Sequence, residues 1–202
     1  MENFVYLVGD KDTKEVLVVD PAWEVDTILR KAAEEDLKVV GALISHHHGD
    51  HTNGIEDLLE RGEVPIYVNK NDAPWVAAPR SSLTEVDNGQ KIPVGKVEIE
   101  CLHTPGHTPG SQCFRVSDNL ISGDTLFIKG CGRCDLPGGD PEKMYYTLTQ
   151  KLMRLPDETV LYPGHNYAPV PTSTLGEEKA ANPYMRTASA SLKDFLKLRM
   201  GR

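Results

Sequence analysis

The sequence predicts an α/β sandwich built around a mixed β-sheet. Short apolar runs that resemble strands alternate along the chain with segments whose apolar residues recur at helical spacing. Several of these runs are joined by turns rich in Gly, Pro, Asp and Asn, which is more typical of hairpins than of a doubly wound parallel fold. With 202 residues, no visible repeat and no low-complexity linker, the chain is expected to form one domain over residues 1–202.

The first half of the chain is predicted to hold a hairpin, two helices and two further strands. Two apolar runs flank the polar turn DKDTK, which indicates a β-hairpin that ends at Asp20 and Pro21. Val25, Ile28 and Leu29 then recur at helical intervals. The expected elements are a helix over residues 23–37, a strand over 39–45, a helix over 52–62, a strand over 64–68 and one or two broken helical turns over 70–80.

The second half begins with β-rich runs and ends with a helix. Between Lys91 and Ser122 the runs KVEIECL, SQCFRV and NLIS are separated by turn residues, so we expect short strands there. Asp140 is the expected N-cap, and Pro141 the first residue, of the next helix. The last expected elements are that helix over residues 140–155, a strand over 159–164 and a terminal helix over 191–200.

Composition excludes several classes of protein. The chain has 30 acidic and 22 basic residues, a net charge of -8, and its basic residues form no run. Nucleic acid and anionic membrane surfaces are therefore not expected partners. No apolar run approaches the roughly 20 residues that span a bilayer. The N-terminal MENFVYLVGD lacks the basic-then-apolar order of a signal peptide, so we expect a cytoplasmic protein.

The four cysteines do not suggest a disulfide framework in a chain of this length. Cys101 and Cys113 lie in apolar strand-like runs and are expected to be buried thiols. Cys131 and Cys134 form a single CxxC. A single CxxC is weak evidence for a zinc or redox site, because a zinc knuckle needs a second pair.

The stretch SHHHGDHTNG contains four of the seven histidines in the chain. If the chain leaves the preceding strand in extended form, His46 and His48 point to one side and His47 points to the other. Asp50 and His51 lie where the chain turns into the next predicted helix. Imidazole and carboxylate groups grouped in this way are typical ligands of zinc and iron.

Further candidate ligands lie in loops beside apolar runs: His103 and His107 in HTPGHTPGS, Asp124 in LISGDTLF, and His165 in VLYPGHNY. Functional residues are often carried on loops at strand ends. These side chains therefore indicate a metal site when they are considered together, although none does so alone. No GxSxG motif is present.

Taken in order, these residues resemble the metallo-β-lactamase fold family. The family pattern is an Asp after an early strand, then HxHxDH, then a His, an Asp and a His. It is matched by Asp20, by residues 46–51, and by His107, Asp124 and His165. The resemblance covers nearly the whole chain. It implies a four-layered αβ/βα sandwich with two mixed β-sheets and with the metals at one edge.

The resemblance implies two metal sites: a first with His46, His48 and His107, and a second with Asp50, His51 and His165. Asp124 would bridge them, and the carboxylates of Asp50 and Asp124 are also predicted to be catalytic. Asp20 would support the ligands from outside the coordination sphere. The implied cofactor is two divalent ions, zinc by preference, with iron or manganese as alternatives. Two divalent ions that share a water make hydroxide available near neutral pH, so such a centre favours hydrolysis of an ester, thioester or amide.

Within the family, the closest resemblance is to glyoxalase II and to persulfide dioxygenases, whose substrates are glutathione thioesters and glutathione persulfide. SHHHGDHTNG is more similar to glyoxalase II, whereas YLVGD, DPAWE, YPGHNY and STLGEEKAANP are more similar to the dioxygenases and related short hydrolases. We predict a thioesterase of glyoxalase II type that cleaves S-acylglutathione with a metal-bound hydroxide. The alternative is a dioxygenase with one iron(II) on His46, His107 and Asp124. A lactonase and a metal-binding protein without turnover are further alternatives.

The resemblance also suggests where substrate binds. It places Cys131 and Cys134, in the GCGR loop, in a substrate-facing position. Glutathione carries two carboxylates, for which Arg133 is the first candidate, with Lys129 and Arg186 as further cations. Tyr167 is a candidate hydrogen-bond partner of the substrate. Only about forty residues follow the last ligand, so no separate C-terminal glutathione-binding helical domain is expected. A glutathione conjugate is the expected partner, and the oligomeric state stays open.

Overall fold

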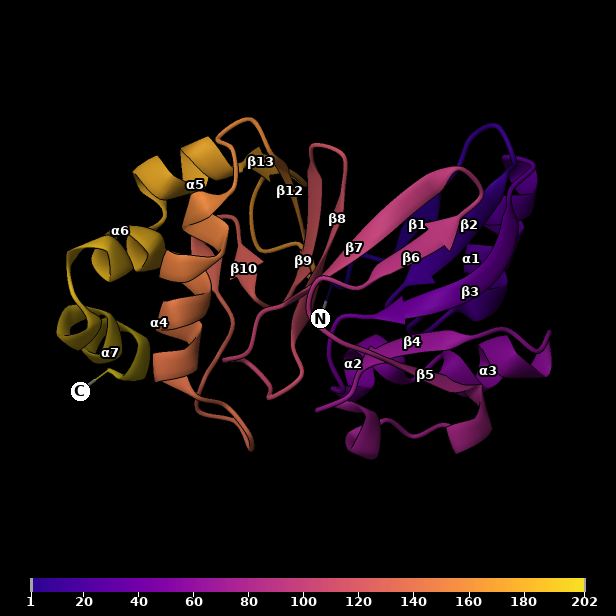
Figure 1. The fold of residues 1–202 in the computed structure, drawn as a ribbon, viewed down its shortest axis with the longest axis horizontal. Helices are drawn as coiled ribbons and strands as arrows, with labels where there is room; N and C mark the ends of the chain where they lie inside the picture. Colours follow the sequence, from indigo (N-terminus) through magenta and orange to yellow (C-terminus); the bar gives the residue numbers. More distant parts are fainter. Residues whose placement is uncertain (1, 202) are drawn as a thin grey trace.

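Two β-sheets packed face to face form the centre of the computed structural model, which describes residues 2–201 (Figure 1). The first sheet has the strand order β1-β2-β3-β4-β5. β1 pairs with β2 in antiparallel orientation, and the other neighbours are parallel. Its strands are β1 (Tyr6–Gly9), β2 (Glu15–Val19), β3 (Lys38–Ile44), β4 (Ile66–Asn69) and β5 (Leu83–Val86).

The second sheet has the strand order β13-β12-β9-β8-β7-β6. β9 and β12 are parallel, and the other neighbours are antiparallel. Its strands are β6 (Lys91–Val94), β7 (Val97–His103), β8 (Gln112–Val116), β9 (Asn119–Gly123), β12 (Val160–Pro163) and β13 (Ser173–Thr174). A separate antiparallel ribbon joins β10 (Leu126–Phe127) to β11 (Gly130–Cys131). Both sheets are therefore mixed, as predicted.

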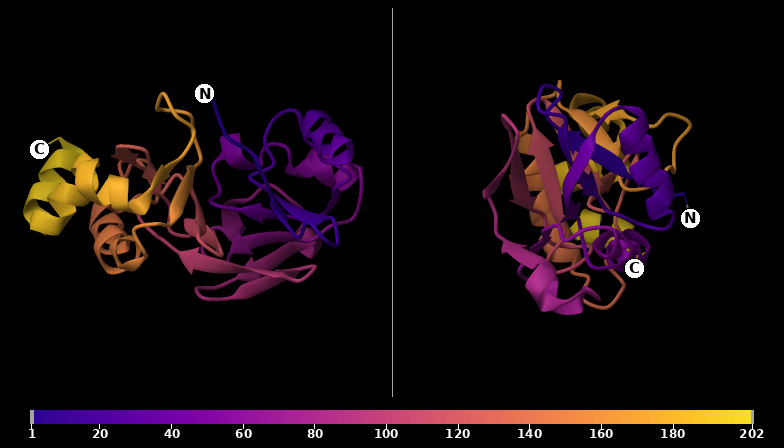
Figure 2. Two further views of the ribbon diagram at one scale, coloured as in Figure 1. Left: turned by 90° about the horizontal axis from the view of Figure 1, so that it is seen from above. Right: turned by 90° about the vertical axis from the view of Figure 1, so that its right-hand side faces the viewer.

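Helices cover the outer face of each sheet, so the layers follow the order α/β/β/α (Figures 1 and 2). The helices of the first half are α1 (Val25–Glu34), α2 (Gly49–Thr52) and α3 (Ile55–Glu60). Those of the second half are α4 (Pro141–Gln150), α5 (Leu175–Ala181), α6 (Pro183–Ala190) and α7 (Leu192–Met200). Single 3₁₀ turns are η1 (Ala73–Trp75), η2 (Arg80–Ser82) and η3 (Leu152–Arg154). The helices α1 and α4–α7 lie at opposite ends of the long axis (Figure 2).

Alternation of side chains along the strands produces this layering. In β2, Leu17 and Val19 belong to the cluster between the sheets, whereas Val18 packs with the residues beneath α1 and α3. In β9, Ile121 faces the cluster between the sheets and Leu120 packs with the buried residues of α4, α6 and α7. Because these strands are apolar on both faces, each sheet buries one face on the other sheet and one on helices.

The carboxyl ends of several strands meet at one edge of the sandwich. β2 and β3 are parallel neighbours, and so are β9 and β12, so the strands of each pair end on the same side. The Gln112 N–H donates a hydrogen bond to the Ser45 carbonyl (2.9 Å) and thereby ties the two sheets together at this edge. The loops that follow the four strands carry four of the predicted site residues: Asp20, His46, Asp124 and His165.

Most predicted elements are present. The hairpin, α1, β3, β4, α4 and α7 lie where the sequence predicts them, and the Asp140 carboxylate caps α4 by accepting a hydrogen bond from the Lys143 N–H (3.0 Å). The helix predicted over residues 52–62 is wrong as a single unit. α2 begins earlier, at Gly49, and α3 starts only after Asn53 and Gly54. β5, β13, the β10–β11 ribbon, α5 and α6 were not predicted.

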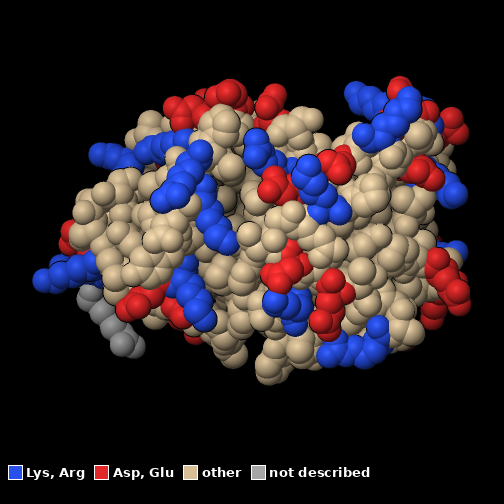
Figure 3. Space-filling model, in the orientation of Figure 1, with Lys and Arg blue, Asp and Glu red and all other residues tan. Residues whose placement is uncertain are grey.

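The surface carries charges of both signs. On the face shown in Figure 3, Lys and Arg side chains are interspersed with Asp and Glu. Some of these side chains form exposed ion pairs, such as Lys91 with Glu98 (2.8 Å) and Lys96 with Asp12 (3.0 Å). None of the helices among residues 2–201 is long and apolar enough to cross a membrane.

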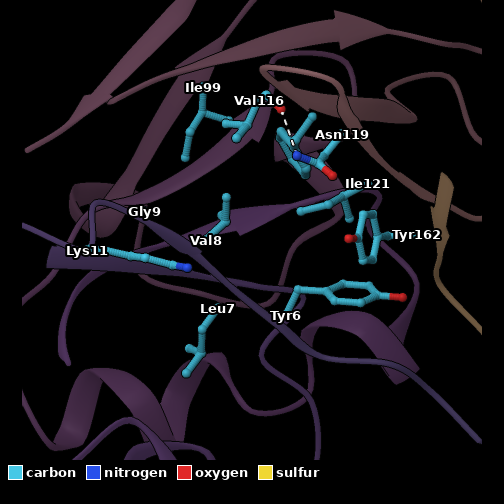
Figure 4. Close-up of a pocket in the computed structure, with 11 residues that line it drawn as sticks. Tyr6, Leu7, Val8, Gly9, Lys11, Ile99, Val116, Asn119, Ile121 and Tyr162 are labelled. Atoms are coloured by element: carbon cyan, nitrogen blue, oxygen red, sulfur yellow. Dashed lines mark hydrogen bonds between the residues drawn. The ribbon is translucent and has the colours of Figure 1, made fainter. Parts of the chain in front are cut away.

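A groove with a volume of about 410 Å³ opens between β1 and strands of the second sheet (Figure 4). Its walls include Val8 and Ile121, the phenol rings of Tyr6 and Tyr162 face each other edge to face, and Lys11 extends over it. None of the predicted metal ligands borders this groove. This groove is therefore separate from the candidate metal centre.

Candidate metal centre

The histidine loop follows β3 and turns directly into α2. His48 is extended (φ -63°, ψ 144°) and precedes the helix as its N-cap residue, so Asp50 and His51 lie in the first turn. His46 and His48 leave the strand on one side, and their ring centroids are 4.7 Å apart. The sequence prediction that these two rings point to a common place is confirmed.

The ligand atoms of seven side chains converge in three overlapping sets, within each of which all atoms lie within 4.8 Å of one another. The sets are His46, His48 and His107; His46, His51 and Asp124; and Asp50, His51 and His165. Every predicted metal ligand belongs to at least one set, although the members are spread over about 120 positions of the sequence. The first and third sets have the same members as the two metal sites that the family resemblance implies.

Distances between facing nitrogen atoms fit shared metal ions. His48 Nδ1 lies 3.0 Å from His107 Nε2, and His51 Nε2 lies 3.3 Å from His165 Nε2. Two nitrogens bound to one tetrahedral zinc ion at its usual bond length are roughly 3.3 Å apart. The Nε2 atom of His46 is buried and has no hydrogen-bond partner among residues 2–201. A buried imidazole nitrogen without a partner is costly unless an ion binds it, so the residues fit a metal.

Asp124 lies between the first and third sets, which we call the outer sets. Its carboxylate oxygens are 3.4 Å from His51 Nε2, 3.2 Å from His165 Nε2 and 3.7 Å from His107 Nε2. Its Oδ1 atom is buried and accepts no hydrogen bond from the described part of the chain. Burial raises the pKa of Asp124, but the hydrogen bond from His165 and the neighbouring histidines lower it overall, so the group is a carboxylate. This placement suits a ligand shared by two ions.

The Asp20 carboxylate orients ligands of both outer sets. Its Oδ1 accepts a hydrogen bond from the Ser45 N–H (2.7 Å), and its Oδ2 accepts from the Ser45 hydroxyl (2.6 Å) and from His51 Nδ1 (2.9 Å). Because the hydroxyl proton of Ser45 is used in this way, Ser45 Oγ accepts from His46 Nδ1 (3.0 Å). Both rings therefore keep Nε2 as the atom free to bind metal.

The backbone at Asp20 is strained. Its φ of +53° lies in the left-handed region, which costs a non-glycine residue on the order of 1–2 kcal/mol. The strained residue directs its carboxylate into the metal centre, where it makes the three hydrogen bonds described above. A backbone carbonyl orients the ring of His107 in the same way, because His107 Nδ1 donates a hydrogen bond to the Arg133 carbonyl (2.7 Å).

Burial and neighbouring charges set the protonation of the ligands. Burial, reinforced by the nearby imidazoles, lowers the pKa of His46 well below 6.5 and that of His48 to about 4. Burial also lowers the pKa of His107. His51 differs, since the hydrogen bond to Asp20 overcomes its burial and raises its pKa to about 9. Three of the four histidine ligands with a shifted pKa are thus held in the neutral form that binds metal.

Asp72 is a site residue that the sequence analysis missed. This buried carboxylate accepts hydrogen bonds from the His47 N–H (2.9 Å), the Thr108 hydroxyl (2.7 Å) and the Gly110 N–H (2.6 Å). Although burial raises its pKa, the hydrogen bonds from His47 and Thr108 lower the pKa overall. It joins the histidine loop to the loop that carries His107. The available signal was the NDAP sequence after a strand, which favours a turn stabilised by an Asx side chain.

Two of the seven histidines lie outside the ligand sets. His47, which the sequence predicts on the opposite side to His46 and His48, belongs to none of the sets, and its Nδ1 lies 3.0 Å from Asp72 Oδ2. Its ring nevertheless stays close to that of His48, with centroids 5.0 Å apart. His103 was a candidate ligand, but its Nε2 lies 2.8 Å from the Pro109 carbonyl and it belongs to none of the sets. It therefore supports the neighbouring loop.

Of the candidate substrate residues, Tyr167 is the one whose side chain contacts a candidate ligand in the described part of the chain. Tyr167 stacks on His165, with ring centroids 4.9 Å apart and planes 13° apart, and 59% of its surface is exposed. The Arg133 guanidinium forms a double hydrogen bond with Asp135 (3.0 and 2.9 Å). Lys129 is exposed in the turn between β10 and β11, and Arg186 is exposed on α6.

The expectation that Cys131 and Cys134 face a substrate is wrong. Both thiols are buried in the cluster beneath α4, α6 and α7, and both are free. Burial raises the pKa of Cys134 to about 11, and it also raises that of Cys131. These thiols are therefore unreactive core side chains. Cys101 and Cys113 are buried thiols, as predicted.

Comparison with known proteins places this geometry in a family. The model of the metallo-beta-lactamase superfamily matches residues 2–165. The chain is 38% identical over 173 residues to the probable hydroxyacylglutathione hydrolase glo2 of Schizosaccharomyces pombe, a match that covers 82% of this chain and 64% of that protein. It is 33% identical over 169 residues to the probable polyketide biosynthesis zinc-dependent hydrolase BaeB of Bacillus velezensis (84% and 75%). It is 31% identical over 204 residues to the mitochondrial persulfide dioxygenase ETHE1 of Homo sapiens (97% and 75%).

Solved structures agree with the sequence comparisons. The crystal structure of ETHE1 from Myxococcus xanthus superposes with a TM-score of 0.89 at 33% identity, covering 98% of this chain and 85% of that one. The crystal structure of TTHA1623 in a di-iron-bound form gives a TM-score of 0.77 at 30% identity, covering 89% and 93%. The chain therefore belongs to the metallo-beta-lactamase superfamily of metal-dependent enzymes.

Proposed function

We propose that this protein is a binuclear metal-dependent thioesterase of glyoxalase II type that hydrolyses S-acylglutathione. The observation that carries the proposal is the position of Asp124 between two complete three-residue ligand sets. His46, His48 and His107 would hold one ion and Asp50, His51 and His165 the other, with zinc, iron or manganese as the metal. Such ions, when bound, lower the pKa of a coordinated water and polarise a carbonyl.

The chain's own residues would supply orientation and charge. Asp124 and Asp50 bring two carboxylates to the centre, where Asp50 Oδ2 is 3.6 Å from both His51 Nε2 and His165 Nε2. The Asn3 amide donates hydrogen bonds to the Asp50 carbonyl (2.7 Å) and to its Oδ2 (3.3 Å), which hold that carboxylate toward the histidines. Tyr167, exposed above His165, is positioned to donate a hydrogen bond to a bound substrate.

The charges of glutathione require cations near the centre. Arg133 is the first candidate, because its carbonyl contacts His107 and its exposed pair with Asp135 is open to exchange with a substrate carboxylate. Lys129 forms no ion pair with any other residue in 2–201, so its ammonium is available without such an exchange. Of the three cations, Arg186 lies farthest along the sequence from any candidate metal ligand. We expect neither a nucleic acid nor a membrane to be a partner of this protein.

A persulfide dioxygenase is the second candidate function. It is favoured by the similarity to ETHE1 proteins, which extends over almost the whole chain in sequence and in structure. In that case a single iron(II) would be held by His46, His107 and Asp124, two imidazoles and one carboxylate. The two functions differ in metal count and in the requirement for oxygen.

One experiment separates the two functions. The protein is purified from metal-replete medium, its metals are counted by mass spectrometry, and cleavage of S-D-lactoylglutathione is assayed beside oxygen uptake with glutathione persulfide. We expect two ions per chain, thioester cleavage and no oxygen uptake. One iron per chain with oxygen uptake and no thioester cleavage would reverse the assignment.

The role of Asp124 is tested in the same assay. D124A is expected to lose metal and activity together, because the shared ligand is removed. D118N is the matched control, since Asp118 is an exposed carboxylate in the turn between β8 and β9. Full metal content and activity in D124A would contradict the bridging assignment.

A further inference from the structure

We propose that a small apolar hollow beside the histidine loop binds the acyl group of the substrate, and that this group is a short apolar chain. The inference rests on the proposed thioesterase function and names its substrate class. The hollow has a volume of about 100 Å³ and is lined by His47, Trp75, Pro109, Pro137 and Gly138. Its walls are one indole ring, two proline rings, a glycine and one imidazole.

Trp75 is an exposed aromatic side chain on a turn that is tied to two neighbouring loops. Its exposed fraction is 68%, which is unusual for an indole. Its turn follows Asp72, whose carboxylate binds the N–H groups of His47 and Gly110. The same buried carboxylate thus holds together the backbone segments that carry Trp75 and His47 on one side of the hollow and Pro109 on the other. An aromatic side chain has few rotatable bonds, so it loses little conformational entropy when a ligand binds against it.

The hollow lies close to the metal ligands. The centroids of the Trp75 and His47 rings are 5.9 Å apart, and those of His47 and His48 are 5.0 Å apart. His48 belongs to the first ligand set. His47 thus borders the hollow and neighbours a ligand of the first set, so an acyl chain whose carbonyl lies at the metal centre would pass His47 to enter the hollow.

The chemistry of the walls selects the acyl half of a thioester. The imidazole of His47 is the single titratable group in the lining, and it faces Asp72 Oδ2 at 3.0 Å. The thiol half, glutathione, carries two carboxylates and an ammonium, which would lose hydration there without compensation. The volume corresponds to roughly three or four carbon atoms if each occupies the ~30 Å³ that a water takes up in the liquid.

Kinetics with a chain-length series tests the proposal. Acetyl, butanoyl and hexanoyl thioesters of glutathione are compared, and kcat/KM is expected to rise by about fourfold per methylene that becomes buried. W75A should reduce the hexanoyl-to-acetyl ratio at least tenfold, chiefly through KM. W23A is the matched control, because Trp23 is similarly exposed (59%) but does not line the hollow. The ratio in W23A should equal that of the parent protein.

A binding measurement tests the hollow independently of catalysis. The chain has two tryptophans, so in W23F the fluorescence reports Trp75 alone. Titration of zinc-loaded W23F with sodium hexanoate should give a saturable change, at concentrations where sodium acetate gives none. W75F, which retains Trp23, should show no saturable change with hexanoate.

The two measurements separate the inference from the function on which it rests. A saturable hexanoate signal without cleavage of any thioester would support the apolar site and overturn the thioesterase function. Thioester cleavage with equal kcat/KM for all chain lengths, no effect of W75A on the ratio and no hexanoate signal would overturn the inference while the function stands. We expect W75A to fold like the parent protein, because the Trp75 side chain is largely exposed.

Discussion

A single strained residue, Asp20, orients ligands of both outer sets. Through Ser45 it fixes the ring of His46, and directly it fixes the ring of His51. We expect D20N to bind zinc about 10- to 100-fold more weakly, because an amide cannot accept all of these hydrogen bonds and a positioning group outside the coordination sphere is lost. Competition with a chromophoric chelator measures this affinity.

D26N provides the control for D20N. Asp26 is an exposed carboxylate paired with Arg61 on the first turn of α1, and its removal should leave zinc affinity unchanged. Equal zinc affinity in D20N and the parent protein would show that Asp20 does not position the ligands.

The buried histidines should make the metal-free protein sensitive to acid. Burial lowers the pKa of His46, His48 and His107 below 6.5, and that of His48 to about 4. Between the folded and unfolded pKa values the unfolded chain binds more protons, so the free energy of unfolding falls as the pH drops from about 6.5 toward 4. His51 acts in a different pH range: its raised pKa adds stability that is complete below about pH 6.5 and is lost as the pH rises toward 9, so it leaves the fall below pH 6.5 unchanged.

Urea denaturation of the chelator-treated protein measures this dependence. We expect a lower midpoint at pH 5 than at pH 7, and a smaller difference in H48Q, which removes one of the three depressed pKa values. A midpoint that is the same at both pH values, or higher at pH 5, would contradict the protonation states assigned to these ligands.

At the scale of elements, the contact between the ends of β9 and β12 leaves no room for a side chain. A Cβ added at Gly164 would lie 2.6 Å from Asp124 Oδ1 and 2.9 Å from the Gly123 carbonyl carbon. G164A should therefore push the two strand ends apart, destabilise the protein by about 1–3 kcal/mol and weaken metal binding. Denaturation and zinc titration measure the two effects.

Gly62 offers a matched control for G164A. It follows α3, and an added Cβ would meet nothing within 4 Å. G62A should leave zinc affinity unaltered and stability nearly so. If G164A binds zinc as tightly as G62A does, the close approach of the strand ends is not needed for the site.

Strands and ligands that lie close together in the sequence could be predicted from local patterns. Features that depend on contacts between distant residues could not. The HxHxDH motif and the apolar runs before it predict β3, the turn and two ligands of one ion, because period-two alternation acts locally. Asp72 could not be identified, since its role depends on Thr108 and Gly110 from a distant loop. The burial of Cys131 and Cys134 depends in the same way on helices that follow them.

Some missed elements had local signals. α5 is preceded by the capping box Thr174 and Glu177, and the N-cap of α6 is Asn182, whose side chain accepts from two backbone N–H groups. Both helices are short, so their few apolar residues show no long periodicity. β5, by contrast, has two exposed residues out of four, and its pairing with β4 makes it a strand. Tertiary contacts decide such segments.

For the molecule as a whole, two sheets bring seven candidate ligands to one edge, and the number of ions that they hold is the central claim. Native mass spectrometry of the protein saturated with zinc counts them directly. We predict two ions per chain in the parent protein and one in D50A, since Asp50 belongs only to the set that contains His165. One ion per chain in the parent protein, unchanged in D50A, would contradict the binuclear centre.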